Sequence, residues 1–321
     1  MLNVERLRAL HAVASHGSMQ AAADALHVTV SAVSQQVAKL EREVGQPLVE
    51  RHGRGVRLTE AARLLVDRAG EILALLERAE GELDQLGGEV TGVVRLGAFP
   101  TAARGLCPGL VVELAGRHPD LDVRVVEAEP VDSVPMLTRG DLDIVVLQDW
   151  YNAPLVLPEV LERLPLFDDV VELALPTGHP MADHAPVRLD DLADERWVSW
   201  PGGSICGDWL THTMRTLGHE PTIVHTAAEH ATQLALVAAG LGPAVMPHLG
   251  LDHVPAGVRL VPVEPTLTRH LFAAWRTDTA RRSAIAAVAT ALSDLAAARR
   301  AETGDDASTP FSHALTTAGG W

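Results

Sequence analysis

Cysteine, aromatic residues and long apolar runs are all scarce in this chain of 321 residues. Its two cysteines, Cys107 and Cys206, are too few for a disulfide framework or a thiolate metal site, so we expect buried structural thiols. No apolar run approaches the roughly 20 residues that a bilayer-spanning helix needs, and no charged-then-apolar leader opens the chain. We therefore expect a soluble cytoplasmic protein.

Basic charge is also in short supply. The net charge of −16 argues against nucleic acid as a partner, because duplex binding depends largely on neutralising phosphates. The charge is uneven, however. Residues 1–60 hold seven basic and six acidic side chains, a net of +1, so the remainder carries −17. If the chain binds DNA, its first 60 residues form the contact, and the acidic remainder limits indiscriminate binding.

Four regions differ in pattern, and the length is sufficient for two or three domains. Residues 1–58 show short helical stretches, and residues 59–88 predict one long helix. Residues 92–300 alternate strand-like and helix-like segments, which is typical of an α/β domain. Residues 301–321 are small, polar and aperiodic, so we expect a disordered tail.

The first region predicts a helix-turn-helix. After a helix over residues 4–15, Ser18 is placed to cap a helix over residues 19–26, and Thr29 is placed to cap a third helix. The third helix has an apolar face and a face of small and amide side chains, which stabilise an exposed helix poorly through charge pairs. That polar face predicts a docking surface. The apolar face holds Val33, Val37, Leu40 and Val44, and the polar face holds Ser31, Ser34, Gln35 and Ala38.

The stretch over residues 47–59 predicts a hairpin that carries Arg51, Arg54 and Arg57. Glycines at its turn permit a tight bend, and arginine suits phosphate or a narrow minor groove. Taken singly, the helices also fit a chance pattern in a helical bundle, and the hairpin also fits a solvated surface. Because polar helix, hairpin and local basic charge fall together within 60 residues, we predict a winged helix-turn-helix that binds DNA.

The long helix carries a heptad seam. Apolar residues recur at alternating steps of four and three over three repeats, with charged residues between them. A single helix packed on a core can show the same stripe, but the strict alternation favours contact with a second helix. We therefore predict a dimer that binds a two-fold DNA site. The predicted seam consists of Leu65, Ala69, Ile72, Leu76, Ala79, Leu83 and Leu86.

The acidic region predicts two similar βαβ units, one from about residue 93, with residues 100–105 as a loop, and one from about residue 170. Open parallel sheets bind ligands beyond the carboxyl ends of their strands, so we expect a cleft between the halves. Strand ends there deliver Thr101 before one helix and Ser204 before another. Glycines and a serine at a helix N-terminus suit an anion such as a carboxylate, although a plain N-cap explains Ser204 equally well.

We find no catalytic motif in the sequence of this region. Because it has no nucleophile elbow, phosphate-binding glycine loop or paired metal-ligand motif, we expect neither an enzyme nor a metal or other cofactor. The histidines lack the spacing of a metal-binding helix, and we interpret them as surface or satisfied polar residues. Glu229 with His225 and His230 is the one cluster to check.

The chain resembles the LysR-type transcriptional regulators from about residue 2 to residue 295. The likeness rests on Leu40-Glu41, the G-x-P-L of residues 45–48, Glu50-Arg51 and the R-L-T-E of residues 57–60, and farther on "GDLDIVV" and "LVAAGLGPAVMP". It implies a winged helix-turn-helix, a linker helix that dimerises, and a two-lobed α/β domain similar to type 2 periplasmic binding proteins. Lobe I would cover about residues 92–165 and 267–300, and lobe II about residues 166–266.

The resemblance also implies partners. Such regulators bind double-stranded DNA at a two-fold operator and a small effector, which by the helix N-terminus argument is an anion here. They assemble as dimers or tetramers, and we expect contact with RNA polymerase. Two rival classes stay open: a solute-binding protein, which needs an export signal, and an α/β enzyme with an accessory helix-turn-helix, which needs catalytic groups in the cleft.

The residues that match the family's functional positions are carried over individually. Val30-Ser31 stand where the family usually has Gln-Pro, so Val30 implies an apolar contact, such as one to a thymine methyl group. The predicted DNA-binding residues are Ser18, Thr29, Val30, Ser31, Ser34, Gln35, Arg51 and Arg54. The predicted effector-binding residues are Phe99, Pro100, Thr101, Gln148, Trp200, Ser204, Thr226, Met246 and Pro247. A cluster of tryptophans at 150, 197, 200 and 209 favours an effector with a flat or apolar body.

Overall fold

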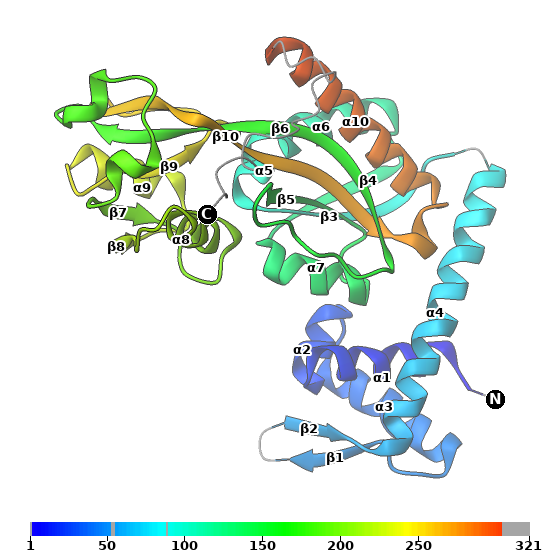
Figure 1. The fold of residues 1–321 in the computed structure, drawn as a ribbon. Helices are drawn as coiled ribbons and strands as arrows, with labels where there is room; N and C mark the ends of the chain where they lie inside the picture. Colours follow the sequence, from blue (N-terminus) through cyan, green and yellow to red (C-terminus); the bar gives the residue numbers. More distant parts are fainter. Residues whose placement is uncertain (1, 53–54, 88, 304–321) are drawn as a thin grey trace, which may run out of the picture.

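The computed structural model describes residues 2–52, 55–87 and 89–303 of the chain. Its N-terminal domain is a small helical body with a two-stranded wing, and a long helix rises from it to a larger α/β domain (Figure 1). This arrangement confirms the predicted fold class. The N-terminal elements are α1 (Val4–His16), α2 (Met19–Ala25), α3 (Val30–Val44), β1 (Val49–His52) and β2 (Gly55–Leu58).

Side-chain caps begin the three short helices. Each cap is a side chain that accepts a hydrogen bond from the backbone N–H three positions later, a group that the helix itself leaves unpaired. The capping residues are Asn3, Ser18 and Thr29. Gly17 and Gly45 end α1 and α3 in the left-handed conformation, with φ of 71° and 72°. The predicted caps at residues 18 and 29 are therefore confirmed.

The linker helix α4 (Glu60–Gly87) divides into two parts. Its first turns pack on α1: Ala69 is fully buried in an apolar cluster with Leu7 and Leu10, and Leu65 lies against the same cluster. Ala69 is therefore wrong as a member of the dimer seam, because its own chain already covers it. Farther along, Ile72, Leu76, Ala79 and Leu83 are exposed, and Leu83 reaches 67%. The side chain of the remaining predicted seam residue, Leu86, lies outside what the structure describes.

The α/β domain is built on a six-stranded sheet with the order β4-β3-β5-β10-β6-β9 and a separate parallel pair, β7-β8. Helices α6 and α10 cover one face of the sheet in lobe I, and α7 covers the face nearer the N-terminal domain (Figure 1). The strands are β3 (Gly92–Ala98), β4 (Leu121–Glu127), β5 (Ile144–Trp150), β6 (Leu161–Pro176), β7 (Arg196–Ser199), β8 (Thr222–Thr226), β9 (Ala244–Pro247) and β10 (Val258–Arg276). The helices are α5 (Pro100–Gly105), α6 (Cys107–Arg117), α7 (Pro130–Arg139), α8 (Ile205–Thr216), α9 (His230–Ala238) and α10 (Ser283–Thr303), with short 3₁₀ turns η1 (Pro180–Asp183), η2 (Leu189–Leu192) and η3 (Thr277–Thr279).

The first βαβαβ unit is confirmed, with β3 parallel to both β4 and β5. The predicted loop over residues 100–105 is wrong, because Pro100 at the first helical position pre-sets φ and the alanines after it propagate helix α5. The second unit is confirmed only in the parallel pair of β7 and β8. Its expected first strand is instead part of β6, which runs antiparallel to β9 and β10.

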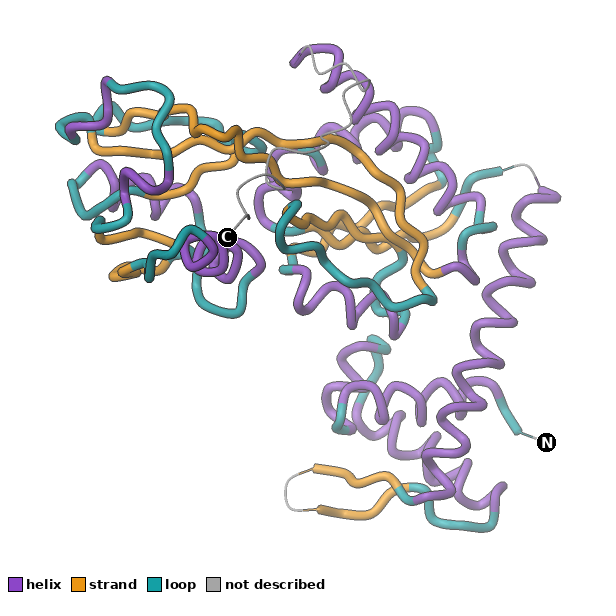
Figure 2. The backbone as a smooth tube through the Cα atoms, in the orientation of Figure 1, coloured by secondary structure: helices purple, strands orange, loops and turns teal. Residues whose placement is uncertain are grey.

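Two long antiparallel strands, β6 and β10, run without a break from lobe I into lobe II (Figure 2). Their register shifts between Pro262 and Leu267 and again between Leu271 and Phe272. Separate apolar cores lie on the two sides of this crossing, one under α6 and α10 and the other around α8. The predicted lobe boundaries near residues 165 and 267 stay predictions. The predicted tail begins inside α10, and residues 304–321 lie outside the described part of the chain. No described helix is long and apolar enough to span a membrane.

Candidate DNA interface and effector cavity

Helix α3 presents the predicted polar face to solvent. Ser31, Ser34 and Gln35 are exposed, while Val33 and Val37 are buried against α1 and α2. Thr29 caps the helix by accepting from Ala32 N at 3.2 Å. The helix therefore offers its first turns, with small and amide side chains, to an outside partner, which is the geometry of a helix that reads the major groove.

Two predicted DNA-binding residues have local structural roles. Val30 is partly buried and packs on the core of the N-terminal domain, so less of it is available for the predicted apolar contact with a base. The Ser18 hydroxyl accepts from Ala21 N at 3.1 Å as the cap of α2. A capping hydroxyl at a helix N-terminus still lies in a favourable place for a phosphate.

The wing is the antiparallel pair of β1 and β2, in which Arg51 lies opposite Val56. Arg57 is exposed on β2. The side chain of Arg51 and the whole of Arg54 lie outside the described residues. The wing is held to α3 by Glu41, whose Oε1 accepts from the N–H groups of Leu48 at 2.8 Å and Val49 at 3.2 Å. Two charge-assisted hydrogen bonds thus fix the orientation of the wing relative to α3.

A small polar cavity lies where the two lobes meet. Its volume is about 10 Å³, close to the space of one water molecule. Lobe I contributes residues at the ends of β3 and β5, and lobe II contributes the starts of α8 and α9. The lining residues are Phe99, Pro100, Thr101, Glu129, Gln148, Trp200, Ser204, Cys206, Ala228, His230 and Arg269.

Arg269, which is only 1% exposed, organises the cavity wall. Its Nε donates to Asp169 Oδ2 at 2.8 Å, its Nη1 to Gln148 Oε1 at 2.6 Å and its Nη2 to Thr101 Oγ1 at 2.9 Å. Asp169 also accepts from Leu249 N at 2.9 Å. A buried cation with a buried carboxylate and two neutral acceptors is a satisfied group, so its charge is largely compensated within the protein.

Glu129 and His230 are less well satisfied. Burial raises the pKa of the Glu129 carboxyl, and no hydrogen-bond donor contacts that carboxyl among the described residues. His230 is 4% exposed and its Nδ1 has no hydrogen-bond partner in the described structure. Burial, with the nearby cations Arg269 and Arg104, lowers the pKa of His230 to about 3, so the ring is neutral at physiological pH.

The start of α8 uses its own polar groups. Ser204 Oγ accepts from Gly207 N at 3.2 Å and donates to Pro201 O at 2.6 Å. Asp208 Oδ1 accepts from Gly203 N at 2.9 Å. The plain N-cap interpretation of Ser204 is therefore the one that the hydrogen bonds support, and a carboxylate of the chain already lies at this helix N-terminus.

Six of the nine predicted effector-binding residues line the cavity, namely Phe99, Pro100, Thr101, Gln148, Trp200 and Ser204. Three predicted residues lie elsewhere. Met246 and Pro247 belong to strand β9 and are buried, Met246 within the core formed with α9. Thr226 ends β8 and is exposed. These three residues do not line the cavity, and the expected loop at 246–247 is instead a strand paired with β6. Effector binding by the three residues stays a prediction.

The sequence prediction missed five lining residues: Glu129, Cys206, Ala228, His230 and Arg269. Glu129 had a usable signal, because it follows β4 and so lies at the carboxyl end of a parallel strand, like Phe99 after β3. The expectation that Cys206 is a buried thiol is confirmed, and burial raises its pKa to about 11. In the cluster of His225, Glu229 and His230, Glu229 instead pairs with Arg104. The described residues contain no group able to hold a metal ion.

An ion pair beside the cavity joins lobe I to lobe II. Arg104 of α5 donates to Glu229 Oε1, at the start of α9, at 3.1 Å and to Gly250 O at 2.7 Å. Glu229 also caps α9 by accepting from Ala231 N at 3.0 Å. One arginine of lobe I thus holds the end of a lobe II helix that carries His230 into the cavity.

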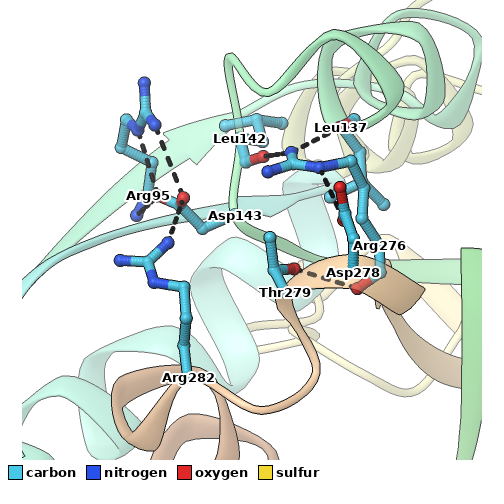
Figure 3. A network of polar contacts seen from close by, with 8 residues as sticks. All are labelled: Arg95, Leu137, Leu142, Asp143, Arg276, Asp278, Thr279 and Arg282. Carbon is cyan, nitrogen blue, oxygen red and sulfur yellow. Dashed lines mark hydrogen bonds and ion pairs between the residues drawn. The ribbon is translucent and has the colours of Figure 1, made fainter. Parts of the chain in front are cut away.

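Figure 3 shows a polar network around the end of β10 and η3. Arg276, at the end of β10, donates to the carbonyl oxygens of Leu137 at 2.9 Å and Leu142 at 3.3 Å. Buried Asp143 accepts from Arg95 Nε and from Arg282 Nη1, both at 3.0 Å. The network fixes the turn between α7 and β5 to η3, the segment on which α4 rests.

This fold and site define a ligand-responsive DNA-binding protein. Residues 4–63 match the model of the bacterial regulatory helix-turn-helix protein, lysR family, and residues 87–297 match that of the LysR substrate binding domain. The chain therefore belongs to the LysR family, and it is a LysR-type transcriptional regulator that responds to a small-molecule effector. Its relatives are transcription regulators, not enzymes, which favours this class over the two rival classes.

Two relatives and two solved structures illustrate the likeness. The chain is 32% identical over 295 residues to a probable hydrogen peroxide-inducible genes activator of Streptomyces viridosporus, over 90% of this chain and 93% of that protein. It is 31% identical over 250 residues to the transcriptional dual regulator OxyR of Escherichia coli, over 78% and 80% of the two chains. A full-length OxyR variant from Pseudomonas aeruginosa superposes with a TM-score of 0.70 at 24% identity, over 91% and 95% of the chains. Full-length BenM superposes with a TM-score of 0.56 at 23% identity, over 94% of this chain and 98% of that chain. These two structural likenesses show the fold alone.

Proposed function

We propose that the chain regulates a promoter by binding a two-fold DNA site as a dimer, with the polar face of α3 in the major groove and the wing on the adjacent backbone. The observation that carries this proposal is the exposure of Ser31, Ser34 and Gln35 on a helix whose other face is buried. Amide and hydroxyl side chains donate and accept, so they can read base edges directly.

The second half of α4 supports the dimer. Ile72, Leu76, Ala79 and Leu83 continue the heptad spacing and are exposed in the single chain. Large apolar residues at such spacing are stabilised when a second helix covers them. A two-fold pair of linker helices would place two copies of α3 on one face of the duplex, and pairing of dimers into a tetramer is compatible with this arrangement.

The cavity between the lobes is the proposed effector site. It gathers Thr101, Gln148 and Arg269 from lobe I against His230 from lobe II, so a ligand there changes how the lobes fit. The proposed site residues are the six predicted residues that line it together with Glu129, Cys206, Ala228, His230 and Arg269. Contact with RNA polymerase and residence in the cytoplasm, where chromosomal DNA lies, complete the proposal.

Hydrogen peroxide, which appears in the names of several relatives, is not proposed as the effector. A thiol attacks as its thiolate, and burial raises the pKa of Cys206 to about 11. Burial also raises the pKa of Cys107, the other cysteine, to about 11. Neither thiol therefore has the low pKa of a redox sensor.

Fluorescence anisotropy with the full chain tests the DNA-binding proposal. The two probes are a duplex from the region upstream of its own gene and a shuffled duplex of the same composition, at physiological salt. We expect the chain to prefer its own duplex, and Gln35→Ala to weaken that binding by about tenfold while binding to the shuffled duplex changes little. Gln46→Ala, an exposed glutamine beyond the far end of α3, is the matched control. Equal binding of both duplexes by the parent chain would contradict the proposal.

A further inference from the structure

The cavity between the lobes is closed. Its volume of about 10 Å³ lies far below the pockets of about 300–1,000 Å³ that usually hold small molecules. Lobe I supplies one wall through Thr101, Gln148 and Arg269, and lobe II supplies the other through Cys206 and His230. An effector can therefore enter only when part of one lobe moves away from the other.

The segment that follows β9 is built into lobe I. Leu249 is buried in the apolar core of lobe I, and its N–H donates to Asp169 Oδ1 at 2.9 Å. Gly250 lies so close to α5 that a Cβ atom there would come within 2.8 Å of Thr101 O. Its φ of 73° also favours glycine, so the backbone conformation and the close approach require the same residue. Residues 248–250 therefore form a fixed joint between the lobes.

Helix α8 is also held firmly to lobe I. Trp150, at the end of β5, stacks on Trp209 of α8 with a centroid distance of 3.8 Å and 14° between the ring planes. Both rings are buried, and Trp209 Nε1 donates to Asn152 Oδ1 at 2.8 Å. Moving α8 away from β5 would expose two large aromatic faces to water. The lobes therefore resist separation on the α8 side of the cavity.

The start of α9 meets lobe I through a weaker contact. Arg104 Nη1 of α5 donates to Glu229 Oε1 at 3.1 Å, and the two side chains are 32% and 53% exposed. An ion pair this exposed contributes little to stability, and salt screens it further. Water can solvate both charges once they separate. Because Glu229 directly precedes His230, breaking this pair frees the helix end that carries His230 in the cavity wall.

We propose that Arg104 and Glu229 form the latch of a gate: the start of α9 moves away from α5 to admit the effector, while the fixed joint and the stacked tryptophans hold the rest of the lobes together. This inference rests on the proposed function, because it names how the proposed effector site opens. Arg104 stays with the joint when the latch opens, because its Nε donates to Gly250 O at 2.7 Å. The balance between the open and closed forms then sets how readily an effector enters.

Alkylation of the two cysteines of the full chain by iodoacetamide tests the gate. Cys206 lines the cavity, where its sulfur accepts from Gln148 Nε2 at 3.5 Å, so opening of the gate exposes it to the reagent. Cys107 lies in the core of lobe I and reports general loosening of the fold. Mass spectrometry of the two cysteine peptides gives both rates. When opening is fast relative to alkylation, each rate follows the population of the open form.

Glu229→Gln keeps the size of the side chain and removes its charge, and we expect Cys206 to react about three- to fivefold faster while the Cys107 rate stays unchanged. Arg104→Gln removes the other partner and leaves the cap that Glu229 gives α9, and it should have the same effect. The double variant should react no faster than the faster single variant, because both changes remove one interaction. Glu220→Gln, which breaks the exposed ion pair with Arg215 within lobe II, is the matched control and should react like the parent.

Several outcomes would overturn the proposal: an unchanged Cys206 rate in both single variants, equal acceleration of Cys206 and Cys107, or accelerations that multiply in the double variant. The proposed function has a separate readout, namely selective DNA binding by the ligand-free chain. Selective DNA binding with an unchanged Cys206 rate rejects the gate alone. Faster reaction of Cys206 with no DNA selectivity rejects the proposed function and leaves the gate in place.

Discussion

His16 Nε2 lies 3.2 Å from Asp141 Oδ1 and so joins the end of α1 in the N-terminal domain to the turn between α7 and β5 in lobe I. Arg139 donates to the other oxygen of Asp141 at 3.1 Å. Arg276 also holds this turn in place, because its guanidinium donates hydrogen bonds to the carbonyl oxygens of Leu137 and Leu142. The DNA-binding domain therefore touches a segment that lobe I fixes rigidly.

Replacing Asp141 tests this domain contact. Asp141→Asn removes the carboxylate that His16 and Arg139 share, and we expect a loss of about 1 kcal/mol from the contact. Hydrogen exchange of the last turn of α1 should then become several-fold faster. Asp132→Asn on exposed α7 is the control and should exchange like the parent. Equal exchange in the two variants would show that the contact does not hold the domain.

The exposed seam of α4 gives a second prediction. Leu76→Asp places an unpaired charge where a second helix should pack, and we expect the dimer dissociation constant to rise at least about a hundredfold. Leu64→Asp, the same change at an exposed position outside the seam, is the matched control. Sedimentation equilibrium measures both. A Leu76→Asp variant that sediments as the parent would refute the contact between linker helices.

The histidine of the cavity predicts a dependence of stability on pH. The unfolded chain binds a proton at His230 near pH 6.5, whereas the folded chain binds it only near pH 3, so acidification favours unfolding. We expect protonation of His230 in the unfolded chain to lower the free energy of unfolding by about 2 kcal/mol as the pH falls from 7 to 5. Urea denaturation at the two pH values should show a smaller loss for His230→Gln than for the parent.

Exposed His212 provides the control for that measurement. His212→Gln should lose stability on acidification as the parent does. If His230→Gln is as sensitive to acid as the parent, the ring is not held neutral by burial.

Thiol chemistry gives a fourth prediction. A pKa of about 11 leaves about one Cys206 or Cys107 thiol in ten thousand ionised at pH 7. We therefore expect alkylation of the two thiols in the folded chain to be slow and to become faster as pH rises. Both thiols should remain unoxidised after treatment with dilute peroxide. Mass spectrometry of the two cysteine peptides measures this, with the urea-unfolded chain as the reactive reference. Rapid, selective oxidation of Cys206 at pH 7 would return peroxide to consideration.

Local patterns predicted much of the fold from the sequence. Caps at Ser18 and Thr29 and the 3.6-residue spacing along α3 depend on neighbours within a few residues, and the structure confirms them. The strand β10 was harder, because its pairing with β5 and β6 joins residues at least 82 positions apart, as in the pair of Val258 and Pro176. Ala69 shows the same limit, since a heptad position does not say which chain covers it.

The cavity was predicted in part for a related reason. Thr101 and Ser204 could be found because each follows a strand and begins a helix, which is a local signal. Arg269 lies in the middle of a long strand, and only the fold brings it to Gln148, 121 residues away. Whether a charged residue in a strand faces a cavity or solvent depends on sheet register, which sequence patterns leave open.

Hydroxyl-radical footprinting of the purified chain on its own upstream duplex, at physiological salt, tests the proposed DNA contact most directly. We expect two protected half-sites on one face of the duplex, separated by a whole number of helical turns of about 10.5 base pairs. The Leu76→Asp variant should no longer protect both half-sites together. A single patch of protection, or uniform protection that a shuffled duplex shows equally, would contradict a dimer that reads two major grooves through α3.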